Sequence, residues 1–209
     1  MLARRVREQR QHQRGTKVYS LHAPEVECIG KGKALRPYEF GVKVSLATTL
    51  HRSKGGQFIA HARALPGNPE PALGLDPRDG HTLATVIPEI ETQIGASLAR
   101  IVADRGYRGH NAPPDHKFKV YISGQRRRVT ETIKRELRRR SAVEPVIGHS
   151  KAEHRMGRNY LAGTHGDAAN AVLAAAGYNF RRLLEWLAAL WRVFVMAIIA
   201  AAWDAPILS

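Results

Sequence analysis

The sequence is poor in cysteine and in acidic residues. Cys28 is the only cysteine among 209 residues, which excludes an internal disulfide framework and a cysteine-rich zinc site. Only 18 Asp and Glu stand against 33 Lys and Arg, so the formal net charge is +15. A charge of this sign and size predicts a polyanionic partner, with nucleic acid the first candidate and an anionic membrane surface the second.

Long hydrophobic runs are also missing. Leu183–Trp203 is apolar but contains Glu185 and Arg192, and its longest uncharged run has 11 residues. A membrane-spanning helix needs about 18 consecutive apolar residues. We therefore expect a helix that is buried or faces a partner, with membrane attachment as the lesser alternative.

The N-terminal segment MLARRVREQRQHQR has no apolar core, so it is not a secretory signal peptide. Its arginines suit a solvated basic arm that lies along phosphates, with an organellar transit peptide as the alternative. We expect a cytoplasmic protein.

The apolar residues follow strand and helix periods in turn. Alternation predicts strands over 38–49 and 57–65, joined as an antiparallel hairpin by Gly55–Gly56. Residues 66–80 are rich in Pro, Gly and Asp and predict a loop. Helical spacing covers 81–98, and the rest is assigned as strands over 99–103 and 117–122 and a helix over 167–203. This order predicts an α/β fold with a mixed sheet.

Two carboxylates stand where chemistry is expected. Asp104 follows the apolar run 99–103, and the carboxyl end of a strand is the usual mouth of a site in an α/β sheet. A turn cap is the alternative. Glu144 has Arg140 four residues before it and Lys151 seven after it, which would place all three on one helix face. A solvated, salt-bridged face is the alternative, and Pro145 places Glu144 at a helix start or a kink.

Residues 126–140 are the basic centre of the chain, with eight Lys or Arg against two Glu. We expect this stretch to bind DNA phosphates, and the residues that we single out are Arg126, Arg127, Arg128, Arg138 and Arg139. His149 and His154 lie five positions apart, and neither HExxH nor a phosphate-binding GxxxxGK[ST] occurs, so a zinc enzyme and a P-loop NTPase are weak alternatives.

Several longer stretches together resemble one family. They are YSLHAPEVECIGKGKA (19–34), PYEFGVKVS (37–45), ALPGNP (64–69), DGHTL (79–83), ADRGYRG (103–109), RRRSAVEPVIGHSKAEHRMGRNYLAG (138–163) and GDAANAVLAAAGYNFRRLL (166–184). Over about residues 17–192 the chain is similar to bacterial insertion-sequence transposases of the DDE class, in the insertion-sequence-five group.

The resemblance implies a ribonuclease H-like catalytic domain in which two Asp and one Glu bind Mg²⁺ or Mn²⁺. Asp104 matches the second Asp and Glu144 matches the Glu, so both are expected to be catalytic and metal-binding. The family signature around the Glu is Tyr, two residues, Arg, three residues, Glu, six residues, Lys. Arg140 and Lys151 fit this spacing and would hold the DNA backbone, whereas Leu137 stands at the Tyr position.

The first Asp of the family has no counterpart here. In the family it lies on the first strand, upstream of the stretch that matches 19–34. Only residues 1–18 precede that stretch, and Glu8 is their sole carboxylate. We therefore expect the C-terminal part of the catalytic domain: a mixed sheet flanked by helices, without its first strand, and a helical tail. The expected units are a basic arm (1–16), a partial catalytic domain (17–163) and a helical segment (164–209).

The resemblance implies a DNA transposase that binds transposon ends and target DNA in the bacterial cytoplasm, associated with the nucleoid. The alternative is a non-catalytic DNA-binding regulator or inhibitor, which pairs with an intact transposase through Leu183–Trp203. A homo-oligomer is a further expected assembly, and no membrane partner is expected.

Overall fold

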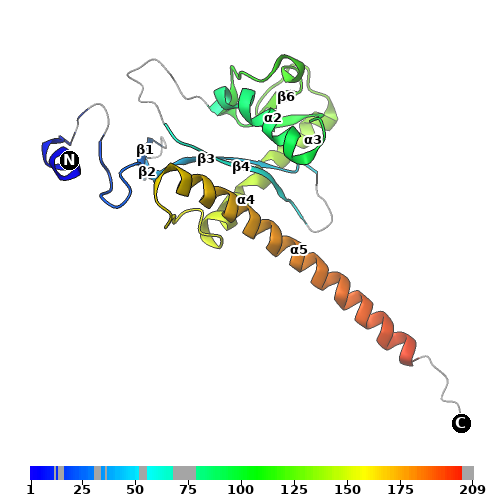
Figure 1. Cartoon of the computed structure of the whole chain (residues 1–209). Coiled ribbons are helices and arrows are strands. Elements are labelled where there is room, and N and C mark those ends of the chain that lie inside the picture. Colours follow the sequence, from blue (N-terminus) through cyan, green and yellow to red (C-terminus); the bar gives the residue numbers. More distant parts are fainter. Residues whose placement is uncertain are drawn as a thin grey trace, which may run out of the picture.

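The computed structural model describes residues 1–11, 13, 17–30, 34–35, 37–51, 56–67 and 79–203. Part of the predicted arm, Gly55 of the predicted turn, most of the predicted loop 66–80 and residues 204–209 lie outside this range. The first helix, α1 (Leu2–Glu8), belongs to the arm and lies at one end of the molecule (Figure 1).

The strands that the structure describes form three separate sheets of two strands each. Strand β1 (Glu27–Gly30) pairs antiparallel with β2 (Tyr38–Gly41), and β3 (Lys43–Thr48) pairs antiparallel with β4 (Ile59–Leu65). Strand β5 (Ile101–Ala103) pairs parallel with β6 (Val120–Ile122). The α/β class and the mixture of pairing directions agree with the prediction. The prediction of a single mixed sheet is wrong for the described residues, because no strand pairing joins the three sheets.

The predicted strand 38–49 is two strands. The break falls at Val42, next to Gly41, whose φ of +143° is a conformation that favours glycine. Strand β2 therefore pairs with β1. Strands β3 and β4 form the predicted hairpin, with a register shift between Ala47 and Thr48.

Helix α2 (Leu83–Ile94) is shorter than the predicted helix 81–98. Gly95 ends it in the left-handed conformation, at φ +64°, which is a common way for a helix to terminate. The apolar spacing that predicts the helix corresponds to its buried face: Leu83, Val86, Ile87 and Ile90.

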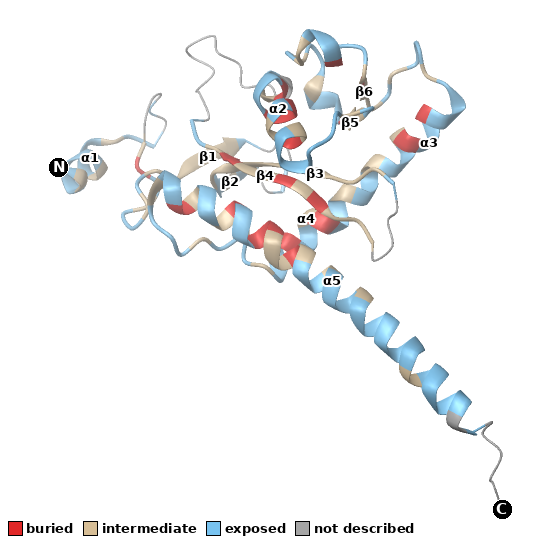
Figure 2. Cartoon of the chain, turned by 45° about the vertical axis from the view of Figure 1, so that its right-hand side comes forward, coloured by how far each residue is buried: buried red, intermediate tan, exposed pale blue. Residues whose placement is uncertain are grey.

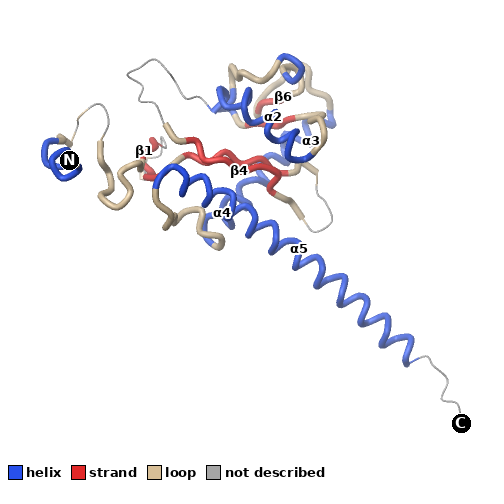
Figure 3. Tube along the Cα trace, in the orientation of Figure 1, coloured by secondary structure: helices blue, strands red, loops and turns tan. Residues whose placement is uncertain are grey.

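The β3–β4 sheet lies between helices (Figures 1 and 3). On one face Ile59 of β4 packs with Val146 of α4 (Val143–Ala152) and with Ala175 and Tyr178 of α5 (Gly163–Trp203). The Asn179 side chain fixes this contact, because its Oδ1 accepts from the Ile59 N–H at 2.9 Å and its Nδ2 donates to the Ile59 carbonyl at 2.8 Å. On the other face lies α2, and a second core of Leu83, Ile87, Ala103 and Val120 joins α2 to β5 and β6.

A carboxylate of α2 ties this helix to the sheet. The Glu89 carboxylate bonds to the buried His61 Nε2 at 3.1 Å and also pairs with Arg63, both on β4. Burial acts to raise the pKa of the Glu89 carboxyl, but the hydrogen bonds with His61 and Arg63 outweigh it, and the pKa lies below its ordinary value.

Glu89→Gln should therefore destabilise the chain at pH 7 but not in acid. A carboxyl whose pKa is lowered by folding contributes stability above its unfolded pKa, about 4.3, and this contribution is lost as the pH falls through the folded pKa. Urea unfolding of both proteins from pH 7 to pH 3 measures the difference. Glu131→Gln, which removes an exposed pair with Lys134, should change stability little at any pH. Equal effects of Glu89→Gln and Glu131→Gln on stability would contradict the role of the Glu89 carboxylate in joining α2 to β4.

Helix α5 has two unlike halves (Figure 2). The first half packs on β4 and contains the buried residues Ala171, Ala174, Ala175 and Tyr178. The second half projects beyond the sheet and exposes large apolar side chains: Leu183, Leu184, Leu187, Leu190, Trp191, Val193, Phe194, Met196, Ile198, Ile199 and Trp203.

The expected burial of Leu183–Trp203 is therefore wrong within this chain, because the helix runs past the end of the surface on which it packs. A partner for this half remains a prediction. By length and composition alone, Gly163–Ala201 could also cross a membrane, and none of its most apolar window is buried in the structure.

Candidate active site

Asp104 lies directly after β5, as the sequence predicts, and it also caps a turn. Its Oδ1 accepts a hydrogen bond of 2.6 Å from the Arg105 N–H at the start of a 3-10 turn (Arg105–Tyr107). The other oxygen, Oδ2, is left for contacts outside the turn, and 59% of the side chain is exposed. The turn cap and the site position are thus compatible.

Glu144 is the second residue of α4. Pro145 follows it within the first turn, where a missing N–H costs no helical hydrogen bond, so Glu144 stands at a helix start. The Glu144 side chain is 67% exposed. Arg140 precedes α4 in a 3-10 turn (Arg140–Ala142) that continues from α3 (Glu131–Arg139).

The two carboxylates meet at one guanidinium. Arg140 Nη1 lies 3.3 Å from Asp104 Oδ2, and Arg140 Nη2 lies 3.5 Å from Glu144 Oε1. The Arg140 side chain is only 23% exposed, so it bridges the carboxylates from below an open surface. The structure therefore brings Asp104, Arg140 and Glu144 together.

Lys151 does not join this group by a direct contact. Its Nζ lies 3.1 Å from Glu39 Oε1 on β2. The sequence spacing does not predict Glu39 as a partner of Lys151, because β2 and the end of α4 are far apart in the chain. Lys151 does line the same cavity as Asp104 and Arg140, which has a volume of about 1000 Å³.

The predicted DNA-binding arginines are exposed, and Arg138 and Arg139 shortly precede Glu144 in the chain. Arg126, Arg127 and Arg128 occupy the segment after β6, and Arg138 and Arg139 form the last turn of α3. The Arg128 guanidinium lies 5.4 Å from the centre of the exposed Phe118 ring. No ion pair within the described residues holds Arg126, Arg127 or Arg139, so their charge is available to a ligand.

A residue pair that the sequence analysis does not identify holds α3 in place. Arg100, just before β5, donates from Nη2 to Glu136 Oε1 at 2.9 Å, and the Glu136 side chain is 3% exposed. No spacing rule links these residues, because one precedes a strand and the other lies on a helix.

The donor set fits part of a site for a hard divalent cation. Asp104 and Glu144 supply carboxylate oxygens, and Mg²⁺ is commonly held by one or two carboxylates together with substrate phosphates. Among the residues described here, no group of three or more His, Cys, Asp or Glu is placed to hold a metal. In this arrangement the Arg140 guanidinium provides the positive charge between the two carboxylates.

Comparison with protein families gives one match. Residues 105–184 match the family model of the transposase DDE domain. The matched stretch contains Arg140, Glu144 and Lys151 and begins immediately after Asp104. It supports a DDE transposase domain without assigning a group within that class. Searches of curated proteins and of solved structures found no match.

Proposed function

We propose that the chain is the catalytic part of a DNA transposase of the insertion-sequence-five group, with Asp104 and Glu144 as ligands of Mg²⁺ or Mn²⁺. The observation that carries the proposal is the approach of both carboxylates to the Arg140 guanidinium. These two residues lie on different elements and share no local structural reason to meet. The match at residues 105–184 supports a DDE transposase, which is the broader part of this proposal.

The residues present suggest a division of roles. When bound, the metal supplies Lewis-acid stabilisation of a phosphodiester under attack by water or a 3′-hydroxyl. Asp104 and Glu144 would hold it and would thereby place the scissile phosphate. Arg140 would then release the carboxylates and bind a phosphate oxygen, for which its planar guanidinium is suited. Lys151 and the arginines of 126–139 would hold the flanking backbone.

Iron-directed cleavage tests the proposed metal site independently of DNA chemistry. Fe²⁺ bound in place of Mg²⁺, with ascorbate and peroxide, cuts the polypeptide near its ligands. We expect cuts close to residues 104 and 144 that excess Mn²⁺ suppresses. Asp104→Asn should abolish both cuts, because the site offers only two carboxylates and the variant leaves one to hold the metal.

Asp115→Asn is the matched control, since Asp115 is an exposed carboxylate in another short turn. Its cleavage pattern should equal that of the unmodified chain. Cuts elsewhere, or cuts that persist in Asp104→Asn, would refute the metal site. In parallel, a DNA-nicking assay with Mn²⁺ should show little activity for the chain alone, because the first Asp of the family has no counterpart before residue 19, and Asp104→Asn should retain DNA affinity. DNA binding without iron-directed cuts near residues 104 and 144 would favour the regulator.

A further inference from the structure

An arginine and an exposed aromatic ring form a stacked pair beside β6. Phe118 lies in the turn before β6 and is 71% exposed. Arg128 lies in the turn after β6, and its guanidinium is over the Phe118 ring, 5.4 Å from the ring centre. A guanidinium over an aromatic face is a favourable contact. It covers only part of the ring, so most of Phe118 is open to a ligand.

The backbone of Arg128 adopts a conformation that is rare for residues with long side chains. Its φ is +58°, and within the described residues the one other non-glycine residue with a positive φ is Arg155, also at +58°. The Arg155 guanidinium lies over an exposed ring too, 5.7 Å from the centre of Tyr160, which is 76% exposed. The rare conformation thus coincides at both places with an arginine on an open ring. Such strained residues cluster where a protein binds a ligand.

The side chain of Gln125 holds the turn that carries Arg128. Gln125 Oε1 accepts from the Ile122 N–H at 3.2 Å, and Nε2 donates to the Arg127 carbonyl at 2.9 Å. The Gln125 N–H also donates to the Ile122 carbonyl at 2.9 Å. These bonds join the end of β6 to the residue before Arg128. The stacked pair is therefore already formed in the free chain, which lowers the entropy cost of binding a ligand there.

The charge around the pair is positive. Residues 114–128 contain one acidic side chain, Asp115, and five basic ones, which are Lys117, Lys119, Arg126, Arg127 and Arg128. Within the described residues none of these five basic side chains forms an ion pair, since the nearest pairs along the chain are those of His116 and Lys134. A ligand that fits this surface combines several negative charges with a flat aromatic group.

We propose that Phe118 and Arg128 stack with an unpaired base of single-stranded DNA, while the basic side chains around them bind the adjacent phosphates. Single strands are commonly bound by aromatic rings on a positively charged surface, with arginine contributing to the stacking. The bases of a duplex already stack on one another, so an open ring adds little to duplex binding. The inference rests on the proposed function only in taking DNA as the ligand, because neither residue belongs to the proposed metal site.

A strand with and without bases measures the stacking. The full chain should bind a single strand of twelve nucleotides about tenfold more tightly than the same strand with abasic sites at its central positions, at equal salt. Loss of one stacked base typically weakens binding by about 5- to 150-fold. Phe118→Leu should remove this difference, because leucine keeps the apolar character without the ring. Both strands carry the same phosphates, so charge alone gives no preference.

Phe180→Leu is the matched control. Phe180 is 65% exposed, but it belongs to α5, which lies on the other side of the β3–β4 sheet from β6 (Figure 1). The neighbouring cation, Arg181, pairs with Glu153 and Glu185. Phe180→Leu should therefore keep the full preference for the strand with bases.

Cross-linking identifies the stacked ring directly. A 5-iododeoxyuridine in the single strand, irradiated with near-ultraviolet light, joins to an aromatic side chain that stacks on it. Mass spectrometry of the digested chain then locates the joined residue, and we expect Phe118. The measurement uses the unmodified chain, so it decides the question even if Phe118→Leu fails to fold.

Three results would overturn this inference and leave the proposed function standing. They are duplex binding without any preference for the strand with bases, equal effects of Phe118→Leu and Phe180→Leu, and cross-links confined to other rings such as Tyr160. Competition by a free mononucleotide as strong as that by the strand would overturn it as well, in favour of a nucleotide site. If neither single-stranded nor duplex DNA binds, DNA is the wrong ligand and the proposed function fails too.

Discussion

Replacing the five exposed arginines that the sequence singles out in 126–139 should weaken DNA binding by about three orders of magnitude near 0.1 M salt. The changes are to Gln at Arg126, Arg127, Arg128, Arg138 and Arg139. Each phosphate contact releases about 0.9 of a counterion, so five lost contacts remove about four to five from the slope of log affinity against log salt. Titration of a short DNA duplex at several salt concentrations measures both quantities.

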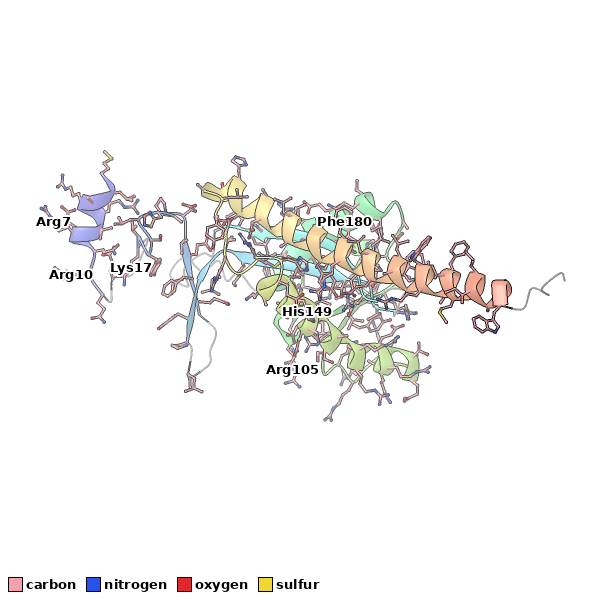
Figure 4. The ribbon with its side chains drawn as sticks, turned by 90° about the horizontal axis from the view of Figure 1, so that it is seen from below. Arg7, Arg10, Lys17, Arg105, His149 and Phe180 are labelled. Atoms are coloured by element: carbon pink, nitrogen blue, oxygen red, sulfur yellow. The ribbon has the colours of Figure 1, made fainter. Side chains whose placement is uncertain are left out.

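The control removes the same charge from the other end of the molecule. Arg4, Arg5, Arg7, Arg10 and Lys17 lie on or after α1, and Figure 4 shows Arg7, Arg10 and Lys17 far from Arg105 and His149. Changing these five to Gln should lower the slope by clearly less. The same loss in both proteins would mean that DNA binding depends on the net charge of +15 and not on the arginines of 126–139.

The sequence predicts the helices and strands whose buried residues recur at one regular spacing. Strand β4 alternates between two covered faces, and α2 buries one stripe, so local spacing contains the information. The separation into three sheets is not predictable in this way, because pairing depends on which distant segments lie alongside each strand. The break at Gly41 is similar, since alternation continues through Val42 although the backbone turns.

The candidate site divides in the same way. Asp104 and the Arg140–Glu144 pair are predictable, because the end of a strand and a spacing of four residues are local features. The contact between Asp104 and Arg140 and that between Lys151 and Glu39 depend on the packing of distant segments. Composition also predicts that α5 is helical and apolar, but only the end of the sheet determines which half is covered.

The buried Glu136 should make Arg100 important for stability. Glu136 Oε1 bonds to Arg100 and lies 3.6 Å from His51 Nε2, while Oε2 is buried without a described hydrogen-bond partner. Arg100→Met would leave a buried carboxylate without its main partner. Breaking a fully buried pair costs about 3–5 kcal/mol, and because Arg100 is 40% exposed we expect about 2–3 kcal/mol. Urea unfolding at pH 7 measures the loss.

A double variant separates the charge from the packing. If the loss in Arg100→Met comes from the unpaired carboxylate, Arg100→Met with Glu136→Leu should recover to within about 1 kcal/mol of the unmodified chain, because an apolar pair of similar volume replaces the ions. A double variant as unstable as the single one would mean that the Arg100 side chain acts by packing. Arg100–Glu136 joins the start of β5 to α3, which leads into Arg140, so the pair orients one candidate-site element against the other. The stable double variant should therefore retain DNA affinity.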